Sequence, residues 1–216
     1  NEAFFFNMVP ESLEENLRRI DDLGTPRAHN HYPWGWAWAG NTPLKRFKRD
    51  THEGGVCDPL IVHWPAKLGR PGQTRHQYVH VVDIAPTILD LLGVEPPARL
   101  AGVVQTPMHG TSFAHTFADA SAASRHVTQY YEMIGSRAIY HEGWKAVVHH
   151  PARAAVYDGT DVSKPFEDDV WELYHVAEDF SEIHDLAAAQ PEKLAELQAL
   201  WWKEAERNQV LPLNNQ

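Results

Sequence analysis

Residues 137–140 and 144–148 are two short runs of strand-forming side chains, and the pair Glu142-Gly143 lies between them. Strand-forming residues on either side of a short turn that contains glycine are typical of a β-hairpin. We therefore expect antiparallel strands in this part of the chain. Residues 171–175 are a candidate for a further strand.

Three other segments of the chain are expected to be helices. Residues 10–23 and 84–92 each repeat apolar side chains at helical spacing. Asp83, before the second run, is a typical N-cap residue, and Gly93, after it, is a typical end of a helix. A last helix is expected over residues 191–208. The chain is therefore expected to be of the mixed α/β class.

Two further segments have no helical period. Residues 26–43 are rich in His, Trp, Gly, Asn and Pro, and we expect an aromatic-rich ordered loop. Trp34, Trp36 and Trp38 in this segment could form a wall that binds a sugar or an aryl group, although loop aromatics more often pack over a core. Residues 59–65 are a short apolar run bounded by prolines, which favours a buried strand.

The balance of charges limits the possible partners. The 216 residues include 19 Lys and Arg against 29 Asp and Glu, a formal net charge of −10. A chain of this kind lacks the positive field that attracts nucleic-acid phosphates or anionic lipids, so we expect no nucleic-acid and no membrane partner. The content of 43% hydrophobic and 11% aromatic residues excludes a disordered chain.

One basic cluster is an exception to the acidic balance. Residues 45–49 contain four cations, and the pair Gly54-Gly55 follows soon after. Cations beside a flexible turn can close on an oxyanion such as sulfate or phosphate. The alternative is a basic turn that is merely solvated.

Cys57 is the single cysteine of the chain. It can form no internal disulfide and no thiolate metal cage, so a reducing compartment fits best. No arrangement of His and Asn residues marks Cys57 as a nucleophile. We expect it to be a small buried residue at the start of the strand over residues 59–65.

Histidines supply weaker candidates for a metal site. His76 and His80 could share a helix face with Asp83 close by, a spacing that can bind zinc. A surface or core-edge role is favoured, because no Glu lies between the two histidines. His149 and His150 are neighbours on a predicted strand. Their side chains should point to opposite faces, which argues against joint action.

Four segments, in order, resemble the type I, formylglycine-dependent sulfatases. They are residues 48–59 (Lys-x-x-Thr-x-x-Gly-Gly-x-x-x-Pro), residues 83–87 (Asp-x-x-Pro-Thr), residues 110–112 (Gly-x-Ser) and residues 172–179 (Glu-Leu-Tyr-x-x-x-x-Asp). Residues 6–12 and 30–36 more narrowly resemble a long bacterial arylsulfatase subfamily. Essentially the whole chain is covered by the resemblance.

The resemblance implies the C-terminal portion of an alkaline-phosphatase-like α/β fold, with a small C-terminal antiparallel sheet and a helix. It also implies an active centre with a formylglycine and a divalent metal, usually calcium, that splits a small-molecule sulfate ester into sulfate and an alcohol or phenol. Lys48 matches the family lysine that contacts the sulfate, where a fixed ammonium would stabilise charge in the transition state. His52, Trp36 and Trp38 are weaker candidates for substrate binding.

Other parts of the family pattern are missing from this sequence. Formylglycine arises from Cys or Ser in Cys/Ser-x-Pro-x-Arg, but Cys57 is followed by Ile61 where the Arg belongs. The metal ligands have no counterpart either, so both cofactors are expected on a missing N-terminal half, the partner of this chain. We expect the chain alone to be inactive, with residues 1–125 completing the catalytic domain and residues 126–216 forming a C-terminal subdomain.

Two alternatives stay open. The chain could be a non-catalytic module of the same fold that binds anionic or sulfated ligands, or part of a phosphoester hydrolase of the same superfamily. A Cys/Ser-x-Pro-x-Arg motif upstream of Asn1 would favour the sulfatase. The expected location is the bacterial cytoplasm, since cysteine is scarce and no Asn-x-Ser/Thr site occurs, with the periplasm as the alternative.

Overall fold

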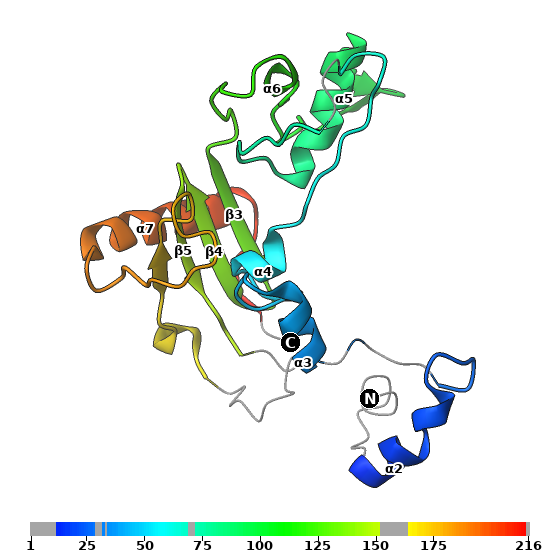
Figure 1. Ribbon diagram of the computed structural model, residues 1–216. Coiled ribbons are helices and arrows are strands. Elements are labelled where there is room, and N and C mark those ends of the chain that lie inside the picture. The colour runs from blue at the N-terminus through cyan, green and yellow to red at the C-terminus, as the bar shows by residue number, and fades with distance from the viewer. Residues whose placement is uncertain (1–11, 29–31, 33, 69–71, 152–163, 215–216) are drawn as a thin grey trace.

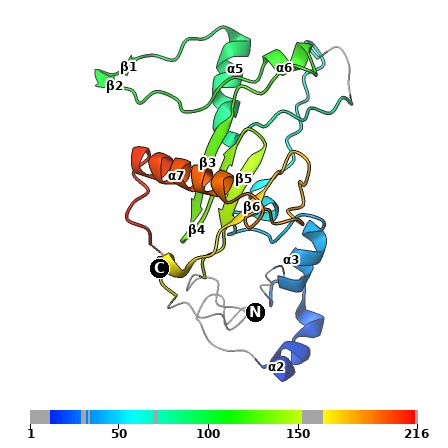
Figure 2. The same cartoon turned by 90° about the vertical axis from the view of Figure 1, so that its left-hand side faces the viewer.

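The structure is a computed structural model that describes residues 12–28, 32, 34–68, 72–151 and 164–214. Its centre is an antiparallel sheet of four strands in the order β3-β4-β5-β6 (Figure 1). The strands are β3 (Thr128–Met133), β4 (Ser136–His141), β5 (Trp144–Val148) and β6 (Glu172–Tyr174). Helix α7 (Pro191–Arg207) lies across one face of this sheet (Figure 2). Among the described residues, none of the helices is long and apolar enough to cross a membrane.

Two tight turns connect the first three strands. Ile134-Gly135 joins β3 to β4, Glu142-Gly143 joins β4 to β5, and the φ angles of these four residues lie between 48° and 91°. Turns of two residues with positive φ match the twist of antiparallel strands. The predicted hairpin is confirmed, and β6, which pairs with β5, confirms the strand expected over residues 171–175.

The face of the sheet beneath α7 carries the main hydrophobic core. Ile139 and Leu173 of the sheet are fully buried against Leu197 and Trp201 of α7. Ala205 continues the same stripe, because residues four apart lie on one face of a helix. The helix expected over residues 191–208 is thus confirmed, and its apolar stripe anchors it to the sheet.

The opposite face of the sheet carries charged as well as apolar side chains. Successive strand residues point to opposite faces, so Lys145, Val147 and His149 lie on this face while Ala146 faces α7. Helix α4 (Glu53–Val56) lies over the charged face (Figure 1).

The other elements are short. They are α2 (Leu13–Arg18), η1 (Ile20–Asp22), α3 (Trp34–Asn41), η2 (Val81–Asp83), α5 (Ile84–Leu92), β1 (Arg99–Leu100), β2 (Val103–Val104), α6 (His115–Ala118) and η4 (Phe166–Asp168). Helix α5 is confirmed, and Gly93 ends it with a φ of 64°. Asp83 precedes α5, but its side chain does not cap that helix, since it accepts from the backbone N–H of His80. The domain boundary after residue 125 stays a prediction.

The first two N-terminal segments differ from expectation. The helix expected over residues 10–23 is shorter and interrupted: Ser12 caps α2, and after Arg19 the chain continues as the 3-10 turn η1. Residues 10 and 11 lie outside the described residues. Part of the expected loop over residues 26–43 is the helix α3. The sequence pattern did not predict this helix, because Trp36 and Trp38 are two positions apart and lie on different sides of it.

Two further expectations are wrong, and one arrangement that was already disfavoured does not occur. Residues 59–65 form no strand and leave Ile61 88% exposed, because no described strand pairs with them. Cys57 is exposed at the C-terminal end of α4 and does not begin a strand. His76 and His80 do not share a helix face, since residues 76–79 are not helical and His80 is the residue before η2.

Candidate active site

The Lys48 loop, residues 45–52, lies between α3 and α4 and is folded tightly. Asn41 donates from Nδ2 to the backbone oxygens of Arg46 and Gly54, each at 2.7 Å. A Cβ atom on Gly54 or Gly55 would overlap backbone atoms of the loop. The Gly-Gly pair is therefore needed for close packing, not for the flexibility that its composition suggests.

Lys48 is exposed at a cavity of about 410 Å³. The residues that line this cavity are Tyr32, Ala37, Gly40, Asn41, Phe47, Lys48, Gly54, Gly55 and Asp58. Trp36 and Trp38 are 68% and 42% exposed on α3 and lie outside this lining. Among the ion pairs of the described residues, Lys45 and Arg46 take part and Lys48 does not. The Lys48 ammonium is thus accessible to a small anionic molecule.

Asp50 is a buried carboxylate beside Lys48. Its Oδ1 lies 2.6 Å from Nδ1 of His52 and accepts from the His52 backbone N–H at 3.0 Å. Its Oδ2 lies 2.6 Å from Nδ1 of His149 and 3.5 Å from the guanidinium of Arg46. Burial alone would raise the pKa of Asp50, but the hydrogen bonds from His149 and His52 outweigh it and hold the pKa well below its usual range. Asp50 therefore stays ionised inside the protein.

His52 lies between two carboxylates and is fully buried. Its Nε2 is 3.3 Å from Glu172 Oε1 but lacks the geometry of a hydrogen bond. Glu172 Oε2 in turn accepts from Lys45 Nζ at 2.7 Å and from the Tyr174 hydroxyl. Burial would lower the pKa of His52, yet the contacts with Asp50 and Glu172 raise it. Substrate contact by His52 stays a prediction, since the structure places its imidazole in this internal network.

The buried residue Lys145 connects the sheet to α4. Lys145 Nζ is fully buried, 2.6 Å from Glu53 Oε1 and 3.1 Å from Glu182 Oε1. The Glu53 backbone N–H donates to Glu182 Oε2 at 2.9 Å. Buried ion pairs hold their groups in defined positions because breaking one leaves an uncompensated charge. The charged face of the sheet thus fixes both ends of the Lys48 loop.

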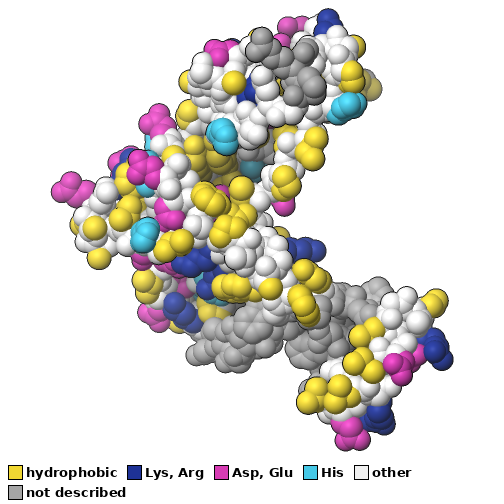
Figure 3. Space-filling model, viewed as in Figure 1, with side chains coloured by type: hydrophobic (Ala, Val, Ile, Leu, Met, Phe, Trp, Pro, Cys, Tyr) yellow, Lys and Arg dark blue, Asp and Glu magenta, His cyan; other side chains and the backbone are white. Residues whose placement is uncertain are grey.

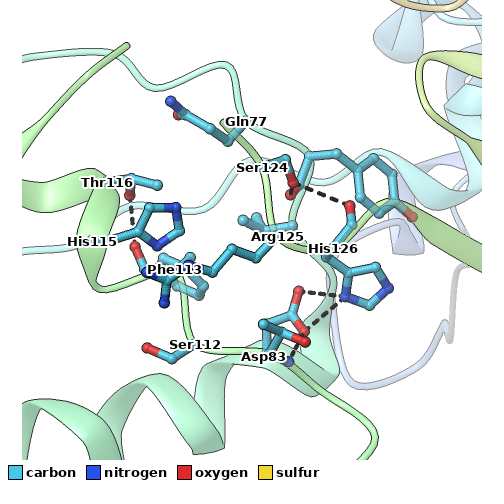
Figure 4. A pocket seen from close by; sticks show the side chains of 12 residues that line it. Gln77, Asp83, Ser112, Phe113, His115, Thr116, Ser124, Arg125 and His126 are labelled. Atoms are coloured by element: carbon cyan, nitrogen blue, oxygen red, sulfur yellow. Dashed lines mark hydrogen bonds and ion pairs between the residues drawn. The ribbon is translucent and has the colours of Figure 1, made fainter. Parts of the chain in front are cut away.

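The motif around Asp83 forms a separate packing unit. Both carboxylate oxygens of Asp83 lie 2.8 Å from His126 Nδ1 (Figure 4), and Oδ1 accepts from the Thr111 backbone N–H at 2.7 Å. Thr87 Oγ1 accepts from the Phe113 backbone N–H at 3.0 Å. The void between these residues has no room for a water molecule. The contacts of Asp83 and Thr87 therefore hold the Asp-x-x-Pro-Thr segment against the Gly-x-Ser segment and the residue that follows it.

Two other kinds of chemistry concern a metal site among the described residues and the thiol of Cys57. Within the described residues, no three His, Cys, Asp or Glu side chains are placed to hold a metal ion. These residues do not fit the divalent metal that the resemblance implies, and we derive no metal-dependent step from them. Burial and the Glu53 carboxylate raise the pKa of the Cys57 thiol, which disfavours its reactive thiolate form.

Sequence reasoning missed the sheet residues that hold the Lys48 loop. Lys145 and Glu172 were not candidates, and His149 was weighed only together with its neighbour. The available signal was the alternation of Lys145, Val147 and His149 on a predicted strand, which places two basic side chains on one face. His149 and His150 do point apart, as predicted: His149 contacts Asp50 and His150 contacts Asp169.

Comparisons with known proteins agree on one family. A family model described as N-sulphoglucosamine sulphohydrolase, C-terminal, matches residues 45–210. An uncharacterized sulfatase of Schizosaccharomyces pombe is 28% identical over 184 residues, 84% of this chain and 31% of that protein. The arylsulfatase of Klebsiella aerogenes is 25% identical over 114 residues, 52% of this chain and 24% of that protein. The chain therefore spans less than a third of the length of these relatives.

Solved structures show the same fold. A structure from a Bacteroides thetaiotaomicron locus for metabolism of multiple glycosaminoglycans is 25% identical, with a TM-score of 0.53 over 72% of this chain and 30% of its own. Ps i-CgsB is 22% identical, with a TM-score of 0.54 over 81% of this chain and 34% of its own. The likeness to Ps i-CgsB concerns the fold alone.

Proposed function

Because this chain belongs to the N-sulphoglucosamine sulphohydrolase C-terminal family and has part of the α/β sulfatase fold, we propose that it is the C-terminal part of an enzyme that hydrolyses sulfate esters. The sulfatase relatives support this reaction in general terms. The formylglycine nucleophile and the metal would come from the part of the enzyme outside this chain.

Lys48 is the residue of this chain that contacts the sulfate in the proposed enzyme. The supporting observation is its position: an exposed ammonium at a cavity of about 410 Å³, on a loop held by buried charges. A cation held in place before the reaction stabilises negative charge on a sulfate oxygen without reorganising in the transition state. This position favours an anion-binding role of the basic cluster over a merely solvated turn.

The proposed substrate is a small-molecule sulfate ester of a phenol or a sugar. The Klebsiella aerogenes relative is an arylsulfatase, which supports an aryl ester. The Bacteroides thetaiotaomicron relative comes from a glycosaminoglycan locus, which supports a sulfated sugar. Both classes present the same sulfate group to Lys48 and differ in the alcohol that leaves.

The test compares Lys48→Ala with the unchanged full-length enzyme, using p-nitrophenyl sulfate and a sulfated monosaccharide. Loss of one charge-stabilising donor should lower kcat by about 10²–10³-fold. Lys203→Ala, at an exposed lysine of α7, is the matched control and should leave kcat unchanged. Unaltered kinetics in Lys48→Ala would remove Lys48 from the mechanism.

Two further measurements separate the proposal from its alternatives. The 216-residue chain alone should release no sulfate, and turnover comparable to the full-length enzyme would contradict its being a part. p-Nitrophenyl phosphate, assayed in parallel, should be the poorer substrate. A preference for phosphate would identify a phosphoester hydrolase, and ligand binding without turnover in the full-length protein would identify a binding module.

A further inference from the structure

His149 connects the sheet to the turn that carries Lys48. It follows the last residue of β5 and lies on the face opposite α7, with its Nδ1 2.6 Å from Asp50 Oδ2. The two residues are 99 positions apart in the sequence. A hydrogen bond of this length to a carboxylate is of the strong, charge-assisted kind.

Asp50 closes the turn in which Lys48 lies. Its backbone N–H donates to the Phe47 carbonyl at 3.2 Å, so Lys48 and Arg49 are the two central residues of a four-residue turn. Arg49 has a φ of 75°, as the third residue of a type II turn requires. A displacement of Asp50 would therefore move the turn that presents Lys48.

The other contacts of the Asp50 carboxylate are local. His52 and Arg46 belong to the same loop as Asp50, so their bonds to this carboxylate do not directly join it to the sheet. His52 Nε2 itself lies 3.3 Å from Glu172 Oε1 of β6, but without the geometry of a hydrogen bond. Among the described partners of this carboxylate, His149 alone comes from the sheet. The ends of the loop are held separately, by Glu172 on Lys45 and by Lys145 on Glu53. His149 thus supplies a direct side-chain hydrogen bond from the end of β5 to the middle of the loop.

We propose that His149 is a positioning residue: through Asp50 it sets the place of the Lys48 ammonium at the cavity. The proposal rests on the function proposed above for Lys48. His149 acts on the turn and makes no contact with the sulfate itself. Removal of its side chain should leave the loop attached at both ends but loosen its middle.

Amide hydrogen exchange of the 216-residue chain tests the positioning directly. His149→Leu should speed amide exchange in residues 47–52 by about 10-fold, because it removes the stabilising free energy of one hydrogen bond to a charged group. The four strands should stay protected. His149→Asn can still donate to Asp50 and should restore slow exchange. His175→Leu is the matched control, since His175 is 25% exposed, close to the 28% of His149, and pairs with the exposed Glu178. Unchanged exchange in His149→Leu would overturn the proposal.

Kinetics of the full-length enzyme test the link to Lys48. His149→Leu should lower kcat for p-nitrophenyl sulfate by about 10-fold, with recovery in His149→Asn. In the Lys48→Ala background the same change should have little further effect, because residues that act through one another are not additive. Effects that multiply, or a rise in KM that His149→Asn does not reverse, would mean that His149 contacts the substrate and does not act through Lys48.

The two hypotheses fail in different ways. Lys48→Ala with unchanged kinetics contradicts the role of Lys48 in sulfate-ester hydrolysis, whatever happens at His149. A large effect of Lys48→Ala together with full activity and slow exchange in His149→Leu contradicts the positioning role alone.

Discussion

The C-terminal sheet with α7 buries many of its hydrophobic side chains, whereas the segments before it leave most of theirs exposed. All but one of the buried hydrophobic residues of the described chain lie between residues 138 and 205, and the exception is Phe113. Residues 59–104 contain exposed apolar side chains instead, such as Ile61 at 88% and Leu92 at 65% exposure. Figure 3 shows hydrophobic side chains on the surface along the segment that leads from α4 to α5.

The difference indicates which region stabilises itself. The sheet and α7 bury each other, so this unit has a core of its own. Many exposed apolar side chains in one part of a chain are typical of a surface that another part of a protein covers. The chain spans 31% of its Schizosaccharomyces pombe relative, and residues 59–104 are expected to pack against the remainder of the proposed enzyme.

The largest expected effect on the free energy of unfolding is at Trp201, in the core between the sheet and α7. Trp201→Ala should lower the free energy of unfolding of the 216-residue chain by about 3–5 kcal/mol, because the indole is fully buried and donates to the Tyr131 carbonyl. Trp202→Ala, at the next position and 45% exposed, is the control and should cost less than about 1 kcal/mol. Urea denaturation measures both. Equal losses would mean that α7 is not part of the core.

A smaller, pH-dependent effect is expected where the two regions meet. The carboxylates of Asp50 and Glu172 have lowered pKa values, so they add stability above their ordinary values of 3.8 and 4.5 and lose it as the pH falls. His52 has a raised pKa, so its contribution is complete below 6.5 and is lost as the pH rises through the folded value. The network should therefore stabilise the chain most between pH 4.5 and 6.5.

His52→Gln measures that contribution. It should lower the free energy of unfolding by about 2 kcal/mol below pH 6.5, and the difference from the unchanged chain should shrink as the pH rises further. The control is His175→Gln, because His175 is partly exposed and pairs with the exposed Glu178; it should change the free energy of unfolding little at any of these pH values. A constant difference across this range would show that folding does not raise the pKa of His52.

The sequence was informative where local chemistry decides the structure. The turn at Glu142-Gly143 and the helix over residues 191–208 depend on short spacings, and both predictions are confirmed. The strand expected over residues 59–65 failed for a physical reason: an apolar run forms a strand only beside a partner, and no described strand pairs with it. The pattern of a single segment does not show whether a partner strand lies beside it.

The candidate site was only partly predictable for a related reason. Lys48 could be singled out because its motif is contiguous. The link from Asp50 to His149 joins residues 99 positions apart, and no local spacing encodes such a contact. The alternation around Lys145 and His149 shows which face they share, but not that the Lys48 loop covers that face. Long-range charge pairing becomes visible only once the strand order is known.

The smallest expected effects compare the two regions most directly, because the same Ile→Val substitution can be made in each of them. Ile139→Val removes one methylene from a fully buried position and should cost about 0.5–1.5 kcal/mol in the 216-residue chain. Ile61→Val, at an 88% exposed position, should cost less than about 0.5 kcal/mol there. In the full-length protein the cost at Ile61 should rise to that at Ile139, since the segment would be covered. An unchanged, negligible cost at Ile61 in the longer protein would mean that residues 59–65 stay on its surface.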